Sequence, residues 1–295
     1  MKFLIFLVLL HLCANLPGAE SRDWWTRFQE IIKQEDEGAF MSYLQGLSGE
    51  ELLHLGEKYC IEYVKSEEQL EATYLVSPIL SQYITIIQGR VDPNTFFNII
   101  VDSRKDPFWR LSVIRWLAEK YRNSKVSNFL TIFDVQTQKR FISTFENILT
   151  NKKENKLVRV QAMCTVECIL DNISQLQISS LVNKEFWKTR TKEYVQTLET
   201  LLQRTDEEEL LVKAAAYLGR QAKTDSSLKE FLLKIFQNRE KYPKRVQYTI
   251  AYHLAEMGEL TILPELGNML KEAEEPEKKQ IQWYIQKLKN MEKEK

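Results

Sequence analysis

The sequence predicts an all-α protein in which helical hairpins stack into an α-solenoid, and three observations lead to this prediction. Apolar residues recur at three- and four-residue spacing along most of the 295 residues, and no stretch alternates as a β-strand would. The helical segments are separated by short turns, and no Gly- or Ser-rich linker divides the chain. Pairs of these segments start at spacings of roughly 35 to 50 residues, a period typical of stacked helical repeats.

Residues 1–19 have the composition of a secretory signal peptide. Lys2 carries the only charge, and an uninterrupted apolar run extends over residues 3–10 and continues past His11. A run this short cannot span a bilayer, which takes about twenty residues. We therefore expect export to the periplasm or the extracellular space. The mature chain is expected to begin near Glu20 and to have no transmembrane span.

Residues 20–91 are expected to form helical pairs that cap the amino-terminal end of the stack. Aromatic and branched residues at helical spacing open this region with an amphipathic helix. Ser48 followed three residues later by Glu51 is the signature of a capping box, which predicts that a helix begins there. A further helix is expected over Leu70–Ile87, and Pro78 should kink or split it.

Residues 92–295 are expected to form the repeat solenoid, closed by a charged terminal helix as its carboxy-terminal cap. Asp92 and Asp106 are each followed by a Pro, which places a cap residue before a Pro at the first helical position. Gly258 should end a later helix, because Gly takes the left-handed conformation without a Cβ clash. The five expected hairpins pair residues 93–104 with 107–122, 138–150 with 155–171, 186–204 with 207–221, 226–238 with 242–257, and 261–271 with 276–290.

The second helices of these hairpins share a sequence pattern. Each of four begins with an apolar residue and a long polar one: Trp109-Arg110, Val158-Arg159, Val212-Lys213 and Val246-Gln247. Small residues and a Leu or Val follow one to two turns later. This pattern resembles the HEAT-repeat (armadillo-type) family, here of an exported bacterial type. The resemblance covers about residues 93–290 and implies a superhelix whose extended concave face binds partners.

Cysteine usage argues against a disulfide framework. Cys13 lies in the predicted signal peptide, and lipid anchoring through it is not expected, because the bulky Leu12 departs from a lipobox. The three remaining cysteines are an odd number in a chain expected to be exported, so they cannot all pair within it. We expect Cys60, Cys164 and Cys168 to be buried free thiols.

Composition and motifs exclude several functions. The 41 basic and 41 acidic residues cancel, which argues against a nucleic-acid-binding surface over the whole protein. No nucleophile elbow, phosphate-binding Gly loop or His-Glu-x-x-His motif occurs. His54 and His253 have no ligand spacing to a cysteine, so neither a metal site nor a cofactor is expected. We therefore expect a non-enzymatic protein-binding scaffold or adaptor in the cell envelope.

The expected contact residues are the exposed members of a set of four basic side chains on second helices: Arg110, Arg115, Arg159 and Lys213. Trp109 and Trp116 share a helix with the first two of these. Such aromatic residues beside guanidinium groups suit a sugar, a base or a peptide, whereas their helical spacing equally suits a packed core. Both interpretations remain open from the sequence.

Two other function classes also remain open. Secreted polysaccharide lyases and glycoside hydrolases use paired helices closed into a toroid, and they need inward-facing carboxylates or a Tyr/His pair. A cleft with two converging carboxylates of raised pKa would favour that class. HEAT-like DNA-binding proteins use aromatic and basic residues on a concave face, but the neutral charge and the predicted export argue against this class.

Overall fold

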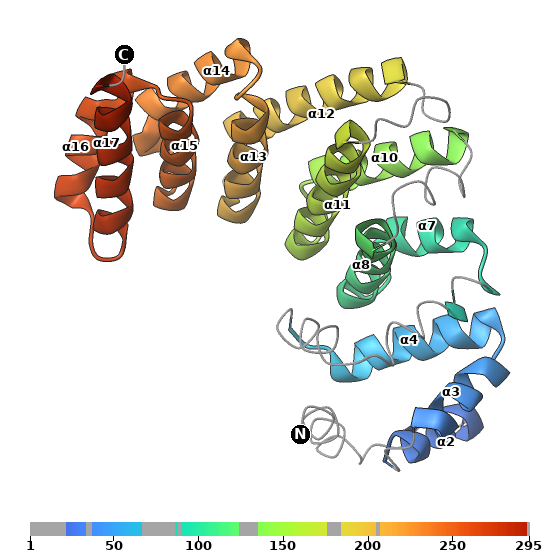
Figure 1. Ribbon diagram of the computed structural model, residues 1–295. Coiled ribbons are helices and arrows are strands. Elements are labelled where there is room, and N and C mark those ends of the chain that lie inside the picture. The colour runs from blue at the N-terminus through green and yellow to red at the C-terminus, as the bar shows by residue number, and fades with distance from the viewer. Residues whose placement is uncertain are drawn as a thin grey trace. The chain divides into compact units, whose positions relative to one another are not determined.

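The computed structural model describes residues 22–33, 37–66, 86–87, 90–123, 135–175, 184–204 and 207–293. These residues form thirteen α-helices, two short 3-10 helices and no strand, so the predicted all-α class is confirmed (Figure 1). No helix within these ranges is long and apolar enough to cross a bilayer. The predicted signal peptide, Cys13 and the helix expected around Pro78 lie outside the described residues.

The chain divides into two compact units, which are described separately: Met1–Leu181 and Val182–Lys295. The first unit contains the helices drawn from blue to light green in Figure 1: α2 (Arg22–Lys33), α3 (Glu37–Gly46), α4 (Gly49–Tyr63), α7 (Pro93–Val101), α8 (Pro107–Asn123), α10 (Val135–Thr150) and α11 (Lys156–Gln175). The second contains α12 (Lys184–Arg204), α13 (Glu208–Gln221), α14 (Ser226–Gln237), α15 (Lys244–Glu256), α16 (Leu263–Glu272) and α17 (Glu277–Lys293). The division falls inside the region predicted as repeats.

Local capping chemistry sets the starts of several helices, as the sequence predicts. The Ser48 hydroxyl accepts from the Glu51 N–H at 3.2 Å, and the Glu51 carboxylate accepts from the Ser48 N–H at 2.7 Å, which completes the capping box of α4. Asp92 accepts from the Asn94 N–H at 2.8 Å and so caps α7. Asp106 accepts from the N–H groups of the second and third residues of α8, each at 2.9 Å. These bonds satisfy donors that a helix start leaves without intrahelical partners.

Helices occur at all five predicted pairs, with small shifts at their ends. The largest shifts, of three or four residues, are an α7 that ends at Val101 instead of residue 104, an α10 that begins at Val135 instead of residue 138, an α11 that ends at Gln175 instead of residue 171, and an α17 that ends at Lys293 instead of residue 290. Asp102 leaves the helical conformation, with φ −77° and ψ 97°, and its carboxylate accepts from the Arg104 N–H at 3.1 Å. That side chain to backbone bond competes with helix propagation and ends α7 early.

The helices of each predicted pair contact each other, and consecutive second helices also make contact. Within the first unit α7 contacts α8, α10 contacts α11, and α8 contacts α11. Within the second unit α12 contacts α13, α14 contacts α15, α16 contacts α17, and α15 contacts both α13 and α17. The second helices therefore form the continuous contact of each unit, and their shared faces contain the core.

Small residues bring α13 and α15 close together. Ala214, Ala215, Ala251 and Ala255 are fully buried. At Gly219 an added Cβ would lie 2.2 Å from Cγ of His253, so only a residue without a side chain fits this contact.

Gly258 follows α15 with φ +70°, which confirms the predicted left-handed helix end. The Trp109 side chain is fully buried, which settles its interpretation in favour of core packing. The side chain of Trp116 lies outside the described residues.

The three described cysteines are free, as expected, but only one is fully buried. Cys60 lies in the core with its Sγ 3.4 Å from the Ser112 hydroxyl. Burial raises the pKa of the Cys60 thiol to about 12, and this outweighs the lowering by the Ser112 hydrogen bond. Cys164 and Cys168 are half-buried, so the expectation of full burial was wrong for these two. They lie one turn apart on α11, on the side of the helix that only partly faces the core.

Candidate binding surface

Arg110 and Arg159 are buried structural residues. Each side chain is only 1% exposed. Nε of Arg110 donates to the Ile100 carbonyl at 2.9 Å, and Nε of Arg159 donates to the Leu149 carbonyl at 2.9 Å. The same bond therefore joins second helix to first helix in two consecutive pairs. It satisfies a carbonyl near the end of the first helix that has no intrahelical partner.

Arg110 also joins one pair to the next. Its two terminal nitrogens donate to the two oxygens of Glu154 at 2.6 and 2.5 Å, and both side chains are buried. Glu154 lies in the turn before α11, so this ion pair connects α8 to the following pair. Burial raises the pKa of Glu154, but the hydrogen bonds from Arg110 and the Asn155 N–H, with the positive charge of Arg110, outweigh it and lower the pKa.

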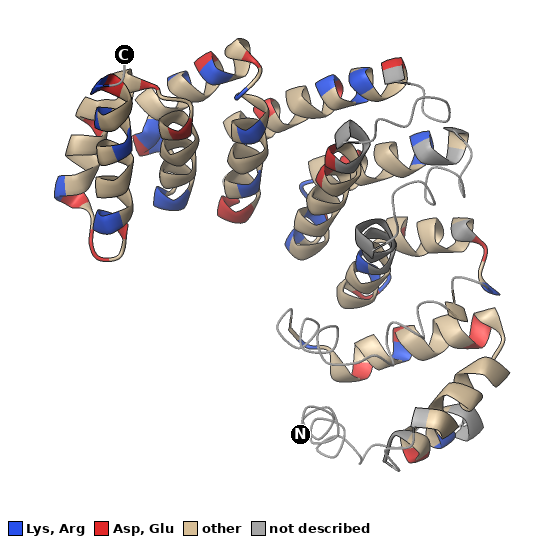
Figure 2. Ribbon diagram, in the orientation of Figure 1, with Lys and Arg blue, Asp and Glu red and all other residues tan. Residues whose placement is uncertain are grey.

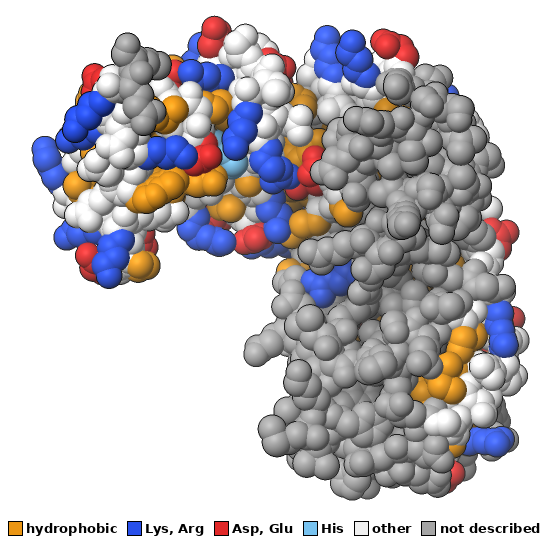
Figure 3. Space-filling model, in the orientation of Figure 1, with side chains coloured by type: hydrophobic (Ala, Val, Ile, Leu, Met, Phe, Trp, Pro, Cys, Tyr) orange, Lys and Arg blue, Asp and Glu red, His pale blue; other side chains and the backbone are white. Residues whose placement is uncertain are grey.

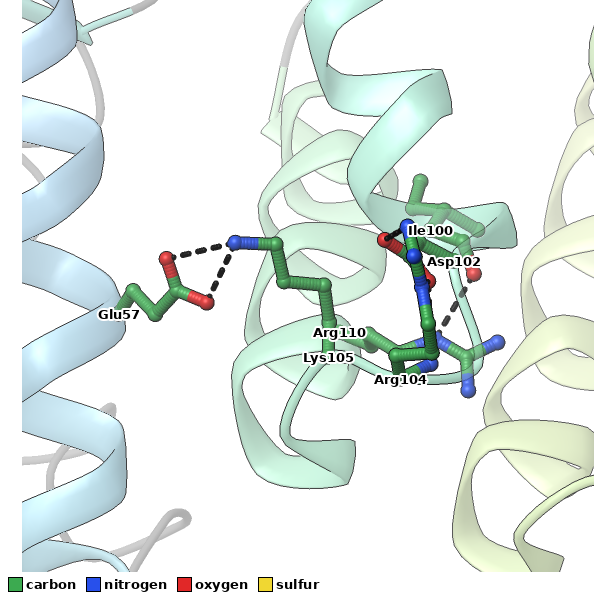
Figure 4. A network of polar contacts seen from close by, with 6 residues as sticks. All are labelled: Glu57, Ile100, Asp102, Arg104, Lys105 and Arg110. Atoms are coloured by element: carbon green, nitrogen blue, oxygen red, sulfur yellow. Dashed lines mark hydrogen bonds and ion pairs between the residues drawn. The ribbon is translucent and has the colours of Figure 1, made fainter.

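A second ion pair extends these connections towards α4. Lys105, in the turn before α8, donates to both carboxylate oxygens of Glu57 on α4 at 2.7 and 2.9 Å (Figure 4). In the same view Arg104 pairs with Asp102 at the end of α7, and the hydrogen bonds from Arg104 lower the pKa of Asp102 to about 2. The polar side chains of these turns therefore bind the helices to one another.

The structure shows which of the four predicted contact residues are exposed. Because Arg110 and Arg159 are buried, they are not among the exposed members of the set. Arg115 is partly exposed, and its Nε donates to the Gln161 side chain at 3.1 Å. Lys213 is partly exposed, with its Nζ 3.9 Å from Glu209. A sequence pattern cannot decide this point, since a long basic side chain at one helical position can turn into the pair or out of it.

The most conspicuous exposed aromatic pair of the described residues lies on the second unit. Tyr252 on α15 is 39% exposed and Trp283 on α17 is 48% exposed. Their rings are nearly parallel, with centroids 6.2 Å apart and planes at 19°. Basic and acidic side chains on α15, on α17 and at the end of α13 lie near the pair. We call the whole the Tyr252–Trp283 surface, which consists of Arg220, Lys223, Tyr252, Glu256, Trp283 and Lys287.

Buried neighbours hold the two exposed rings in place. The Tyr252 ring packs edge-to-face on His253, with centroids 5.0 Å apart, and Trp283 packs edge-to-face on Tyr284 at 5.5 Å. His253 and Tyr284 are both buried. A ring pair held in this way loses little conformational freedom when a ligand binds to it.

The charged side chains form a compact cluster beside the rings. Lys287 on α17 donates to Glu256 on α15, and its Nζ lies 5.0 Å from the Trp283 ring centroid. Lys223, which follows α13, lies 3.7 Å from the same carboxylate. The bond from Lys287 lowers the pKa of Glu256. The two lysines and Glu256 leave a local excess of positive charge in a chain whose formal net charge is zero. Arg220 is a further cation near His253, and its guanidinium lies 5.2 Å from the Tyr217 ring centroid.

His253 contributes no charge to this surface at neutral pH. Burial lowers its pKa to about 4, and repulsion by Arg220 and Lys223 adds to this effect. Its Nδ1 has no hydrogen-bond partner among the described residues.

Figure 3 shows hydrophobic, basic and acidic side chains gathered over α13, α15 and α17, and Figure 2 shows where the charged residues lie along these helices.

Sequence reasoning did not find this surface. The sequence predicts only that residues 276–290, which include Trp283, form a charged terminal helix, and it gives no prediction for Tyr252. The two residues are far apart in the sequence and belong to different pairs, so no spacing rule connects them. Only an alignment of α15 with α17 as equivalent second helices would have placed them side by side.

Among the described residues, Glu199 on α12 and Asp225 before α14 are carboxylates that interact electrostatically. Burial raises the pKa of Glu199, with a further rise from the charge of Asp225. Asp225 caps α14 by accepting from the Ser227 hydroxyl and N–H, and these bonds lower the pKa of its carboxyl. Within these residues no three His, Cys, Asp or Glu side chains converge as metal ligands would.

Comparison of the chain with protein-family models, with curated proteins and with solved structures gave no significant match.

Proposed function

We propose that this protein is an exported, non-enzymatic scaffold or adaptor that binds another protein in the cell envelope, and that its fold is a HEAT-like α-solenoid of antiparallel hairpins. The contacts between paired helices and between consecutive second helices support this architecture. The matching bonds of Arg110 and Arg159 support it too, because the same bond from the second helix to the first occurs in two consecutive pairs, as expected of structural repeats. The composition of residues 1–19 supports export.

The observation that carries the binding proposal is the exposed, nearly parallel Tyr252–Trp283 ring pair. Large aromatic side chains are enriched among the residues that dominate the energy of protein interfaces. Exposed apolar side chains that lie together on a surface often mark a site where a partner binds. The surrounding cations supply a polar rim and favour a partner of opposite charge.

Capture from an envelope extract tests this proposal. The mature chain, from Glu20 onward, is immobilised and its bound proteins are identified by mass spectrometry, in parallel with a Tyr252→Ala, Trp283→Ala double variant. An Ile61→Ala, Val101→Ala variant is the control, because these side chains are also large, apolar and exposed, at 46% and 52%. We expect one enriched protein that the first variant loses and the control retains.

Other results would point to the alternative classes. Captured polysaccharide with released sugar, in the absence of an enriched protein, would replace this proposal with the lyase or hydrolase class. Tight binding of duplex DNA that weakens steeply with salt would favour the DNA-binding class.

A further inference from the structure

We infer that the Tyr252–Trp283 surface binds a short acidic peptide segment of the partner, in which one or two carboxylates flank an aromatic or large apolar side chain. This inference rests on the proposed function and adds the chemistry of the ligand. It follows from three features of the surface: the sign of its charge, its limited length and the rigidity of its rings.

The sign of the charge indicates an anionic ligand. Lys223 and Lys287 both lie against the carboxylate of Glu256, so two cations face one anion there. Each lysine has three N–H donors and uses only part of this capacity on Glu256. A peptide carboxylate placed beside Glu256 would accept the remaining donors and balance the excess positive charge. A neutral sugar would leave that charge without a counterpart.

The length of the positive region favours a short peptide over a polyanion. At the other end of α13, Glu208 and Glu209 pair with the exposed Arg245. That acidic end lies about 16 Å from Arg220, at a rise of 1.5 Å per residue along the helix. A nucleic acid or sulfated chain that followed α13 from the lysines would meet these carboxylates. An extended segment of about four residues, roughly 14 Å long, ends before it reaches them.

The rings add the apolar part of the recognition. The nearly parallel rings of Tyr252 and Trp283 each pack edge-to-face on a buried ring, Tyr252 on His253 and Trp283 on Tyr284. An aromatic or large apolar side chain packed against this ring pair would bury its exposed surface at little entropic cost. Lys287 contacts the Trp283 ring and also binds Glu256, so the apolar and anionic parts of the ligand must lie next to each other.

A peptide selection tests this inference. A random peptide library displayed on phage is selected against the mature chain, and the consensus peptide is synthesised for titration by fluorescence anisotropy. We expect a consensus with Asp or Glu next to Phe, Tyr, Trp or Leu. Trp283→Ala is expected to weaken binding of that peptide by at least tenfold, and Tyr252→Ala by a similar factor.

Charge variants test the second half of the recognition. Arg220→Gln with Lys223→Gln should weaken binding about tenfold and flatten its dependence on salt. The matched control, Arg104→Gln with Lys152→Gln, removes two exposed charges from the other unit and should leave the affinity within twofold. Circular dichroism and melting temperature confirm that every variant is folded, which is expected because all four side chains are exposed or partly exposed.

Three results would overturn the inference: a selection without a consensus, a neutral or basic consensus, or an acidic consensus peptide whose affinity none of these variants changes. Binding of a ten-nucleotide oligothymidine or of heparin in preference to the peptide would do the same.

These results are separable from the proposed function. If the envelope partner is still captured by the Tyr252→Ala, Trp283→Ala variant, the ligand chemistry is wrong and the scaffold function stands. An acidic consensus with no captured envelope protein would support the peptide-binding site and contradict the proposed binding to an envelope protein.

Discussion

Arg110 and Glu154 form a buried, two-bond ion pair between α8 and the turn that opens the next helical pair. The same guanidinium bonds the Ile100 carbonyl, so one side chain joins a helix to its own partner and to its neighbour. This double role explains why a charged residue stands in the core. It also gives a direct test of how the first unit is held together.

Removal of one member of this pair should destabilise the protein strongly. Glu154→Ala leaves the Arg110 guanidinium buried without a counter-charge, which typically costs about 3 kcal/mol or more. We expect urea unfolding followed by circular dichroism to show this loss. Arg104→Ala breaks an exposed pair with Asp102 and should change stability little. An Arg110→Met, Glu154→Leu variant should recover much of the loss, since no unpaired charge remains buried.

The contact between α13 and α15 predicts a second stability effect. Gly219→Ala would place a Cβ 2.2 Å from Cγ and 2.8 Å from Cβ of His253, so the helices must move apart. We expect a loss of about 1–3 kcal/mol in the free energy of unfolding. Gly267→Ala is the control: nothing lies within 4 Å of its added Cβ, and it lies within α16. It should be neutral or slightly stabilising, because Ala favours helix more than Gly.

A double-mutant cycle then assigns this effect to the contact itself. Combining Gly219→Ala with His253→Ala should restore part of the lost stability, since the 2.2 Å contact with the imidazole ring is removed and only the 2.8 Å contact with the Cβ of residue 253 remains. Additive losses in the double variant would contradict the steric explanation.

The lowered pKa of His253 predicts a pH dependence of stability. The unfolded chain takes up a proton near pH 6.5, whereas folded His253 does so only near pH 4. The unfolded state therefore binds more protons between these values, and stability should fall as the pH is lowered from 6.5 to 4. The slope from this one group is at most about 1.4 kcal/mol per pH unit.

Urea titrations at pH 7.5, 6.0, 5.0 and 4.5 measure this slope. His253→Gln should remove most of it, and His54→Gln, at an exposed position, should leave it unchanged. A slope that is the same in wild type and His253→Gln would show that another group titrates in this range.

The predicted export is testable on the protein as it is made. We expect the chain recovered from the envelope or culture medium to begin at or near Glu20 by amino-terminal sequencing. Leu7→Arg interrupts the apolar run and should leave the unprocessed chain inside the cell. Recovery of the intact amino terminus from the exported wild-type protein would contradict the signal-peptide interpretation.

The sequence by itself determined the helices. Ser48 with Glu51, Asp92 and Asp106 predicted helix starts that the structure contains, and Gly258 predicted a helix end, because capping depends on groups a few residues apart. Apolar periodicity likewise identified the segments that form the second helices. The few shifted ends, such as that of α7 at Asp102, arise from local bonds that periodicity does not describe.

Tertiary structure alone decided where the long polar and aromatic side chains go. The sequence left open which of the four basic residues on second helices are exposed. Arg110 and Arg159 turn into the helical pairs, where each donates to a carbonyl of the first helix and Arg110 also binds Glu154. Tyr252 and Trp283 instead turn outward and lie together. Each of these outcomes depends on distances between groups on different helices, and a one-dimensional pattern contains no such distances.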